Sequence, residues 1–169
     1  AYLMPNGDLV RAGKVLDNEV FGSRGPSGGR VERFNWEGER LWDFVYSNDR
    51  HHQHHDIEPL PNGNALILAW EKRTKAEAIA AGRKPDTVSD QGIFPDTVVE
   101  VKQTGPTTGE VVWSWSAWDH LIQDHDSSKA NYGDVAAHPE KIDINLNPRP
   151  RTDWMHTNGI DYNPELDQI

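Results

Sequence analysis

The stretch LPNGNAL at residues 60–66 decides the fold, because the chain carries a close copy of it, MPNGDLV, at residues 4–10. Both copies place Asn-Gly between an apolar residue and an apolar run. Asn-Gly is the strongest two-residue signal for a β-hairpin, since both residues tolerate a positive φ. The two stretches therefore predict two hairpins that belong to repeated units.

A second pair of echoes extends the repeat. GERLW at 38–42 matches GEVVW at 109–113, and an alternating strand precedes each copy, RVERFNW at 30–36 and DTVVEVKQ at 96–103. Radially repeated four-stranded units are typical of a β-propeller. We expect an all-β chain in which residues 1–169 form a partial propeller of about two to three blades. A β-sandwich with coincidental turns is the alternative.

Two insertions interrupt the predicted strands, at about residues 72–92 and 119–151. In the first, TKAEAIAAG predicts a short helix with Thr74 as its cap and Gly82 as its stop. The second is polar and rich in turns, and it predicts a long loop with a helical turn. Loops of this length in a compact domain are usually functional or disordered.

Composition excludes several classes of function. The formal net charge of −10 argues against a nucleic-acid binder, which needs a basic surface. No apolar run is long enough to span a membrane. The absence of cysteine excludes disulfides and thiolate chemistry. Because two to three blades cannot close a ring, and the chain begins inside a strand pattern, we expect it to be part of a longer protein.

Four histidines lie together in RHHQHHD at residues 50–56. The run is internal and broken by Gln53, which rejects a purification tag. Successive strand residues point to opposite faces, so adjacent histidines cannot share one ion, and a metal site is disfavoured. The conservative interpretation is that these are buried polar residues satisfied by the backbone, with Asp56 orienting a histidine or capping a turn.

The second half of the chain suggests which histidine matters. Aligning Pro164 with Pro61 places His156 on Gln53 and Asn158 on His55. Residues two apart in a strand share a face, and equivalent inner-strand positions converge on a propeller's channel. We therefore expect His55, His156 and Asn158 to line one polar pocket. His54 is expected to face the other way, or to take part from a bulge.

The remaining aromatic and histidine residues have simpler interpretations. Surface positions are predicted for His120, His125 and His138. Packing between blades is predicted for Trp36, Trp42, Trp113, Trp115 and Trp118.

Two motifs resemble the bacterial arylsulfotransferase family that works without phosphoadenosine phosphosulfate. They are HHDIEPLPNGN at residues 54–64 and DWMHTNGIDYNPELDQI at 153–169. The resemblance implies a six-bladed propeller that transfers a sulfuryl group from an aryl sulfate to a phenol through a sulfated histidine. Carried onto this sequence, it implies His156 and His55 as catalytic residues, and Asn158 and, less directly, His54 as substrate-binding residues.

The resemblance also implies what the chain needs from elsewhere. The nucleophilic histidine and a pocket arginine would follow Ile169. No cofactor or metal is implied, and the partners are an aryl sulfate, a phenol and the rest of the propeller. A periplasmic or secreted location is implied, and a homo-oligomer stays open.

Two other functions compete with this one. A propeller of quinoprotein-like ancestry can act as a binding scaffold, because fold does not determine function. A quinone-dependent dehydrogenase would need a set of calcium-binding carboxylates that we do not find in the sequence.

Overall fold

The computed structural model describes residues 1–22 and 28–169. The chain divides into two compact units. The first contains residues 1–70, 97–114 and 157–169, and the second contains residues 71–96 and 115–156. Each unit is described by itself.

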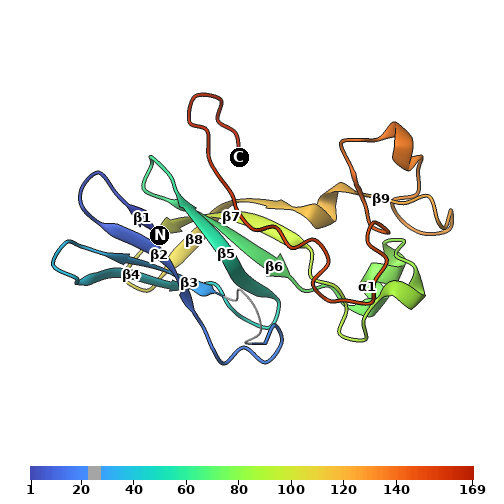
Figure 1. The fold of residues 1–169 in the computed structure, drawn as a ribbon, viewed down its shortest axis with the longest axis horizontal. Coiled ribbons are helices and arrows are strands. Elements are labelled where there is room, and N and C mark those ends of the chain that lie inside the picture. Colours follow the sequence, from blue (N-terminus) through green and yellow to red (C-terminus); the bar gives the residue numbers. More distant parts are fainter. Residues whose placement is uncertain (23–27) are drawn as a thin grey trace. The chain divides into compact units, whose positions relative to one another are not determined.

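The first unit begins with a four-stranded antiparallel sheet in the order β1-β2-β3-β4 (Figure 1). Its strands are β1 (Tyr2–Leu3), β2 (Leu9–Lys14), β3 (Gly29–Phe34) and β4 (Arg40–Val45). Each strand lies beside the next one in the chain. This simple meander is the strand order expected of one propeller blade.

A second four-stranded sheet repeats this order as β5-β6-β7-β8. It contains β5 (His51–Pro59), β6 (Ala65–Glu71), β7 (Asp96–Gln103) and β8 (Gly109–Ser116). The predicted strand at 96–103 matches β7 at both ends. The predictions of an all-β chain and of a repeated unit are thus confirmed, while the number of blades stays a prediction.

The two Asn-Gly hairpins have the same hydrogen bonds. Met4 N–H donates to Asp8 O at 2.7 Å, and the equivalent Leu60 N–H donates to Asn64 O at 2.8 Å. The turn glycines have φ of 87° at Gly7 and 85° at Gly63, where a side chain would be strained. The two similar sequences therefore also have the same backbone geometry.

The two sheets share one apolar core. One face of the first sheet contributes Val10, Val31 and Trp42, and one face of the second contributes Ile57, Ile67 and Val101. Val31, Ile57 and Val101 each stand between two charged residues, as expected for strands with one buried face, whereas β6 is buried along its whole length. This packing fixes which face of β5 is turned to the core.

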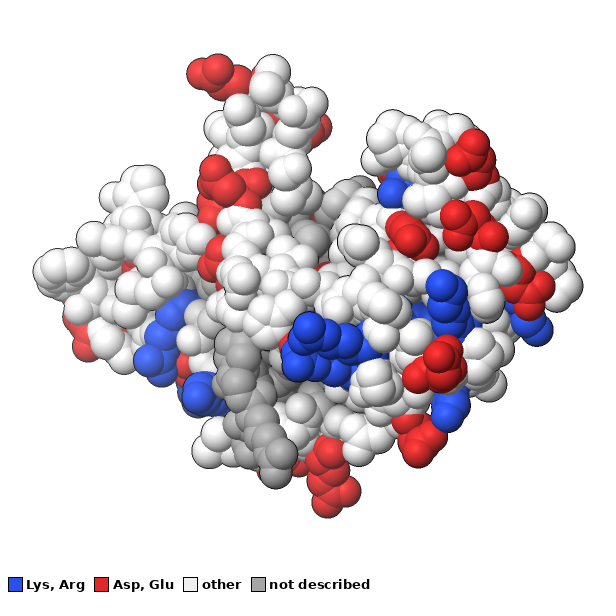
Figure 2. Space-filling view, turned by 45° about the vertical axis from the view of Figure 1, so that its right-hand side comes forward, with Lys and Arg blue, Asp and Glu red and all other residues white. Residues whose placement is uncertain are grey.

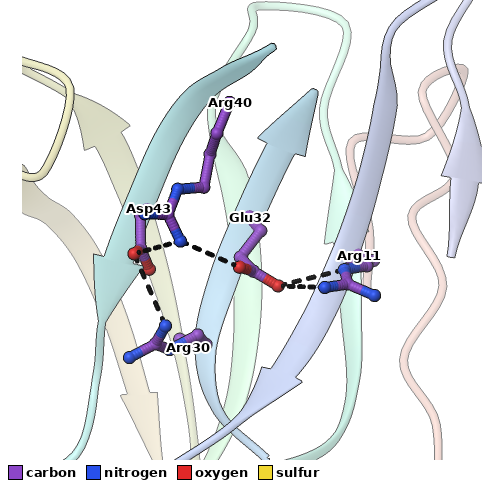
Figure 3. Close-up of polar contacts among 5 residues, drawn as sticks. All are labelled: Arg11, Arg30, Glu32, Arg40 and Asp43. Carbon is purple, nitrogen blue, oxygen red and sulfur yellow. Dashed lines mark hydrogen bonds and ion pairs between the residues drawn. The ribbon is translucent and has the colours of Figure 1, made fainter. Parts of the chain in front are cut away.

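The opposite face of the first sheet carries a network of ion pairs (Figure 3). Glu32 on β3 bonds Arg11 on β2 at 2.8 Å, and Arg40 on β4 bonds Asp43 at 2.9 Å. Gly13 makes room for the network, because an added Cβ would lie 2.7 Å from a Glu32 carboxylate oxygen. The charged positions of the predicted strand RVERFNW are therefore paired across the sheet surface.

The second unit contains both predicted insertions. Helix α1 (Lys75–Ala80) begins at Thr74, whose side chain accepts from Glu77 N–H in a capping box, and Gly82 follows its end at φ 102°. The helix prediction is confirmed. The second insertion holds short 3-10 turns at Ala117–His120 and Val135–Ala137, and the parallel pair β9 (Leu121–Ile122) and β10 (Ile142–Asp143). A further 3-10 turn lies at Pro85–Thr87.

The expectation that five tryptophans pack between blades is wrong in part. Trp42 is buried in the shared core, but Trp36 is 78% exposed and Trp113 is 42% exposed. Trp36 lies in the turn after β3, and β8 is the last strand of its sheet, so neither position has a second layer over it in these residues.

No described helix is long and apolar enough to cross a membrane. Figure 2 shows acidic side chains over much of the face in view, with basic side chains in a few groups.

Candidate functional site

Strand β5 does not alternate as a regular strand would. His52, Gln53 and His54 are all fully buried, and His55 is only partly buried. His55 has a φ of 49°, which breaks the two-residue alternation at this point. The preference for His55 over His54 as the channel-facing residue relied on regular alternation, which the strand does not keep at this point. Which of the two rings faces the channel stays a prediction.

His52 is a neutral histidine held in an aromatic stack. Its ring lies 5.5 Å from Phe21 and 6.3 Å from Trp70, and its Nδ1 pairs with the Ser47 hydroxyl at 2.9 Å. Burial, and to a smaller extent electrostatic interaction with the neighbouring His54, lowers the pKa of His52 to about 4. His52 is thus uncharged near neutral pH and serves the packing of β5.

His54 and His55 form a pair. Their Nδ1 atoms lie 2.9 Å apart, so one Nδ1–H group donates a hydrogen bond and the other Nδ1 accepts it. The buried ring of His54 stacks on Trp70 at 4.2 Å. Trp70, for which the sequence suggested no role, therefore supports His54, and His54 in turn orients the more exposed His55.

Asp56 joins the two sequence motifs. Its Oδ1 accepts from Ile57 N–H at 3.0 Å, and its Oδ2 accepts from Ile160 N–H at 3.2 Å. Asp56 therefore holds backbone over a hundred residues away, and neither predicted role, orienting a histidine or capping a turn, is confirmed. Asn158, two residues before Ile160 and exposed to solvent, is brought to the same region of the first unit as His55.

Carboxylates dominate one side of this region. Burial and the nearby Asp161 and Asp56 raise the pKa of Glu58, although the hydroxyl of Tyr2 that donates to it acts in the opposite direction. A sulfate would be repelled from this side.

His156 lies at the end of the second unit, in a segment without strand structure. The argument that His156 and Asn158 share a strand face is therefore wrong. His156 is exposed and has a φ of 63°, and its Nδ1 is hydrogen-bonded to the Asp153 carboxylate. Asp153 is a residue that sequence reasoning missed, although it opens the motif DWMH that signals it.

All eight histidines are described, and only His55 and His156 have a positive φ. Residues other than glycine rarely adopt this conformation, although histidine does so more often than most, and such conformations concentrate at functional sites. Both rings also have Nδ1 hydrogen-bonded to another side chain. His55 and His156, which the sequence motifs singled out, therefore share a left-handed backbone that the motifs alone did not predict.

Metal ligation finds no support in the geometry. Within residues 1–22 and 28–169, no group of three or more His, Asp or Glu side chains is placed to hold an ion. Of the four remaining histidines, His51 lies in the first unit against Tyr46, and three lie in the second unit, where His125 and His138 are exposed and His120 is partly buried against Trp115.

A family model described as arylsulfotransferase (ASST) matches residues 17–169. No curated protein and no solved structure matches the chain.

Proposed function

The chain belongs to the arylsulfotransferase family, and from this premise we propose that it forms part of an enzyme that moves a sulfuryl group from an aryl sulfate to a phenol. The two repeated meander sheets support a β-propeller, in which they are neighbouring blades of a six-bladed ring. The periplasm or the exterior of the cell is the proposed location.

The proposed reaction has two steps. In the first, a histidine nitrogen attacks sulfur, the sulfur–oxygen bond to the aryl group breaks, and the departing phenolate takes up a proton. In the second, the oxygen of a phenol attacks sulfur, the nitrogen–sulfur bond breaks, and the phenol's proton passes to a base. Negative charge on the sulfuryl oxygens is best stabilised by preorganised N–H donors.

The residues of this chain fill the supporting roles. His156 serves as a sulfate ligand or as the general acid for the departing phenolate, and Asn158 donates its amide N–H to a sulfuryl oxygen. His55 is a second ligand or proton carrier. His54 was expected to bind substrate, but its burial beneath His55 supports an indirect part. The nucleophilic histidine is expected outside these 169 residues.

The observation that carries this proposal is the shared geometry of His55 and His156. Each lies in a family motif, each has a left-handed backbone, and each has Nδ1 occupied by another side chain. Locking Nδ1 directs the opposite nitrogen, Nε2, outward from the supporting group. This is how a protein presents one imidazole nitrogen to a substrate.

The test is turnover of a chromogenic aryl sulfate with a phenol acceptor by the intact protein. His156→Ala is expected to lower kcat/KM by roughly 10²-fold or more, the usual contribution of a general acid. His138→Ala is the matched control, because His138 is an exposed histidine of the same unit. Unchanged turnover in His156→Ala would remove His156 from the mechanism.

A second measurement separates catalysis from binding. Mass spectrometry of protein quenched during turnover should find a sulfated histidine that is neither His55 nor His156. A protein that binds the aryl sulfate and never forms this adduct would instead be the non-catalytic propeller scaffold. That outcome is the competing function, and it would overturn the transfer reaction.

A further inference from the structure

The carboxylate of Asp153 accepts a hydrogen bond from His156. Asp153 Oδ2 pairs with Nδ1 of His156, three residues later, across a turn that the positive φ of His156 makes possible. Both side chains are partly exposed, 38% for Asp153 and 41% for His156. The pair therefore lies where a solute can reach it.

The backbone beneath this pair is held from two sides. Phe94 N–H donates to Thr152 O at 2.6 Å, and Phe94 forms a parallel bridge with Asp153. Trp154, the next residue, is buried in the core of the second unit, and its indole N–H donates to Leu146 O at 3.0 Å. Asp153 is thus held by an isolated β-bridge to Phe94 and is followed directly by a buried tryptophan.

The buried Arg83 packs against the ring of Trp154. The Arg83 guanidinium lies 5.5 Å from the Trp154 ring and donates to the carbonyls of Ile144 and Asn147, the latter at 3.0 Å. Both partners belong to the second insertion, while Arg83 belongs to the first. The two insertions together therefore form the base on which the Asp153–His156 turn rests.

One oxygen of Asp153 has no structural use. Its Oδ1 is buried and accepts no hydrogen bond from the described residues, whereas Oδ2 is taken by the histidine. Leaving a buried carboxylate oxygen unsatisfied is unfavourable, so a residue chosen for stability alone would not be an aspartate. The bond to His156 is the contact that accounts for the carboxylate.

Resting on the proposed role of His156, we propose that Asp153 is a positioning residue that keeps Nδ1 of His156 protonated and confines its proton exchange to Nε2. A carboxylate accepts and cannot donate, so it selects the tautomer with hydrogen on Nδ1. The same bond survives when the ring gains a second proton. His156 can then take up and deliver a proton at Nε2 without turning its ring.

The decisive experiment measures the tautomer of His156 directly. Long-range 15N–1H NMR of histidine-labelled protein distinguishes a protonated Nδ1 from a protonated Nε2, and the His156 signals are assigned by their loss in His156→Gln. In the wild type, above the pH at which the ring is charged, Nδ1 is expected to carry the proton. A wild-type His156 with hydrogen on Nε2 would overturn the proposal without any variant.

Substitution then tests the cause. In Asp153→Asn the amide can donate to the ring, so the His156 tautomer is expected to shift toward Nε2–H, whereas Asp153→Glu should keep Nδ1–H in part. Glu140→Gln is the matched control, because Glu140 pairs with Nδ1 of His138 at 2.9 Å in the same unit. This control should change the His138 signals and leave those of His156 in place.

Turnover supplies the functional half of the test. Asp153→Asn is expected to lower kcat by at least about tenfold with little change in KM, up to the roughly 10²–10⁴-fold that a general acid contributes. Asp153→Glu should recover part of the loss. Full activity with an altered tautomer would overturn the positioning role. If the wild type shows no transfer, the proposed function fails and the NMR result alone decides whether Asp153 sets the tautomer.

Discussion

Neighbouring histidines of β5 do different work because burial and partners change at every residue. His52 is stacked and neutral, His54 is buried against Trp70, and His55 is partly buried and has a left-handed backbone. Gln53 between them accepts from Gly29 N–H at 2.7 Å and joins β5 to the first sheet. Within this run, His52 packs in the interior and Gln53 joins the two sheets. His54 supports the neighbouring His55, which is the candidate catalytic group.

The lowered pKa of His52 predicts a pH-dependent stability. Between about pH 4 and pH 6.5, His52 is protonated in the unfolded chain but stays neutral in the folded chain, where its pKa is about 4. The stabilisation is therefore complete above pH 6.5 and is lost as the pH falls toward 4. The difference between the two pKa values of His52 corresponds to up to about 3 kcal/mol in the free energy of unfolding.

Urea unfolding at several pH values between 4 and 7.5 measures this effect. His52→Gln should flatten the pH dependence across that window, because it removes the group that titrates. His125→Gln, a change at an exposed histidine, should keep the wild-type slope. Equal slopes in wild type and His52→Gln would mean that His52 is not held neutral by the fold.

Between elements, Arg83 links two segments that are distant in sequence. The side chain is 1% exposed, and burial lowers its pKa, which the nearby Asp143 opposes. Among the described residues its guanidinium donates to backbone carbonyls only, on the 3-10 turn at Thr87 and on the loop at 144–149. A planar fork of five donors satisfies several carbonyls at once, which a lysine cannot do.

Arg83→Lys is therefore expected to destabilise the second unit by about 2–4 kcal/mol, since buried carbonyls lose their donors. Hydrogen–deuterium exchange should show faster exchange at residues 144–149 and at Trp154. Arg149→Lys is the matched control, because its side chain is exposed and only its backbone carbonyl contacts Arg83. Wild-type protection in Arg83→Lys would show that the loop is held by other contacts.

At the scale of the molecule, the first unit depends on one core between two sheets. Val31 of β3 is fully buried in it, whereas Val112 of β8 is 47% exposed. The same substitution at these two positions therefore separates packing from strand propensity.

Val31→Ala is expected to lower the free energy of unfolding by about 2 kcal/mol, from two lost methyl-sized groups and the cavity they leave. Val112→Ala should change it by less than about 0.5 kcal/mol. Chemical denaturation of the two variants side by side checks the difference. Similar losses at both positions would contradict a core shared between the sheets.

Local signals predicted most of the elements correctly. The Asn-Gly turns, the cap at Thr74 and the strand at 96–103 depend on residues a few positions apart, and the structure confirms each of them. The same local reasoning does not apply at His55 and at His156. There the backbone leaves the regular strand, so an argument from two-residue periodicity had no basis.

The sequence by itself determined the repeated hairpins, the grouping of strands into four-stranded units, and the motifs that mark His55 and His156. Only the tertiary structure decided that Asp56 holds Ile160, that Arg83 braces Trp154, and that Asp153 is paired with His156. The physical reason is the distance along the chain between the residues that determine each feature. Turns and caps are set by neighbours along the chain, whereas hydrogen-bond partners and burial are set by segments that meet only when the chain has folded.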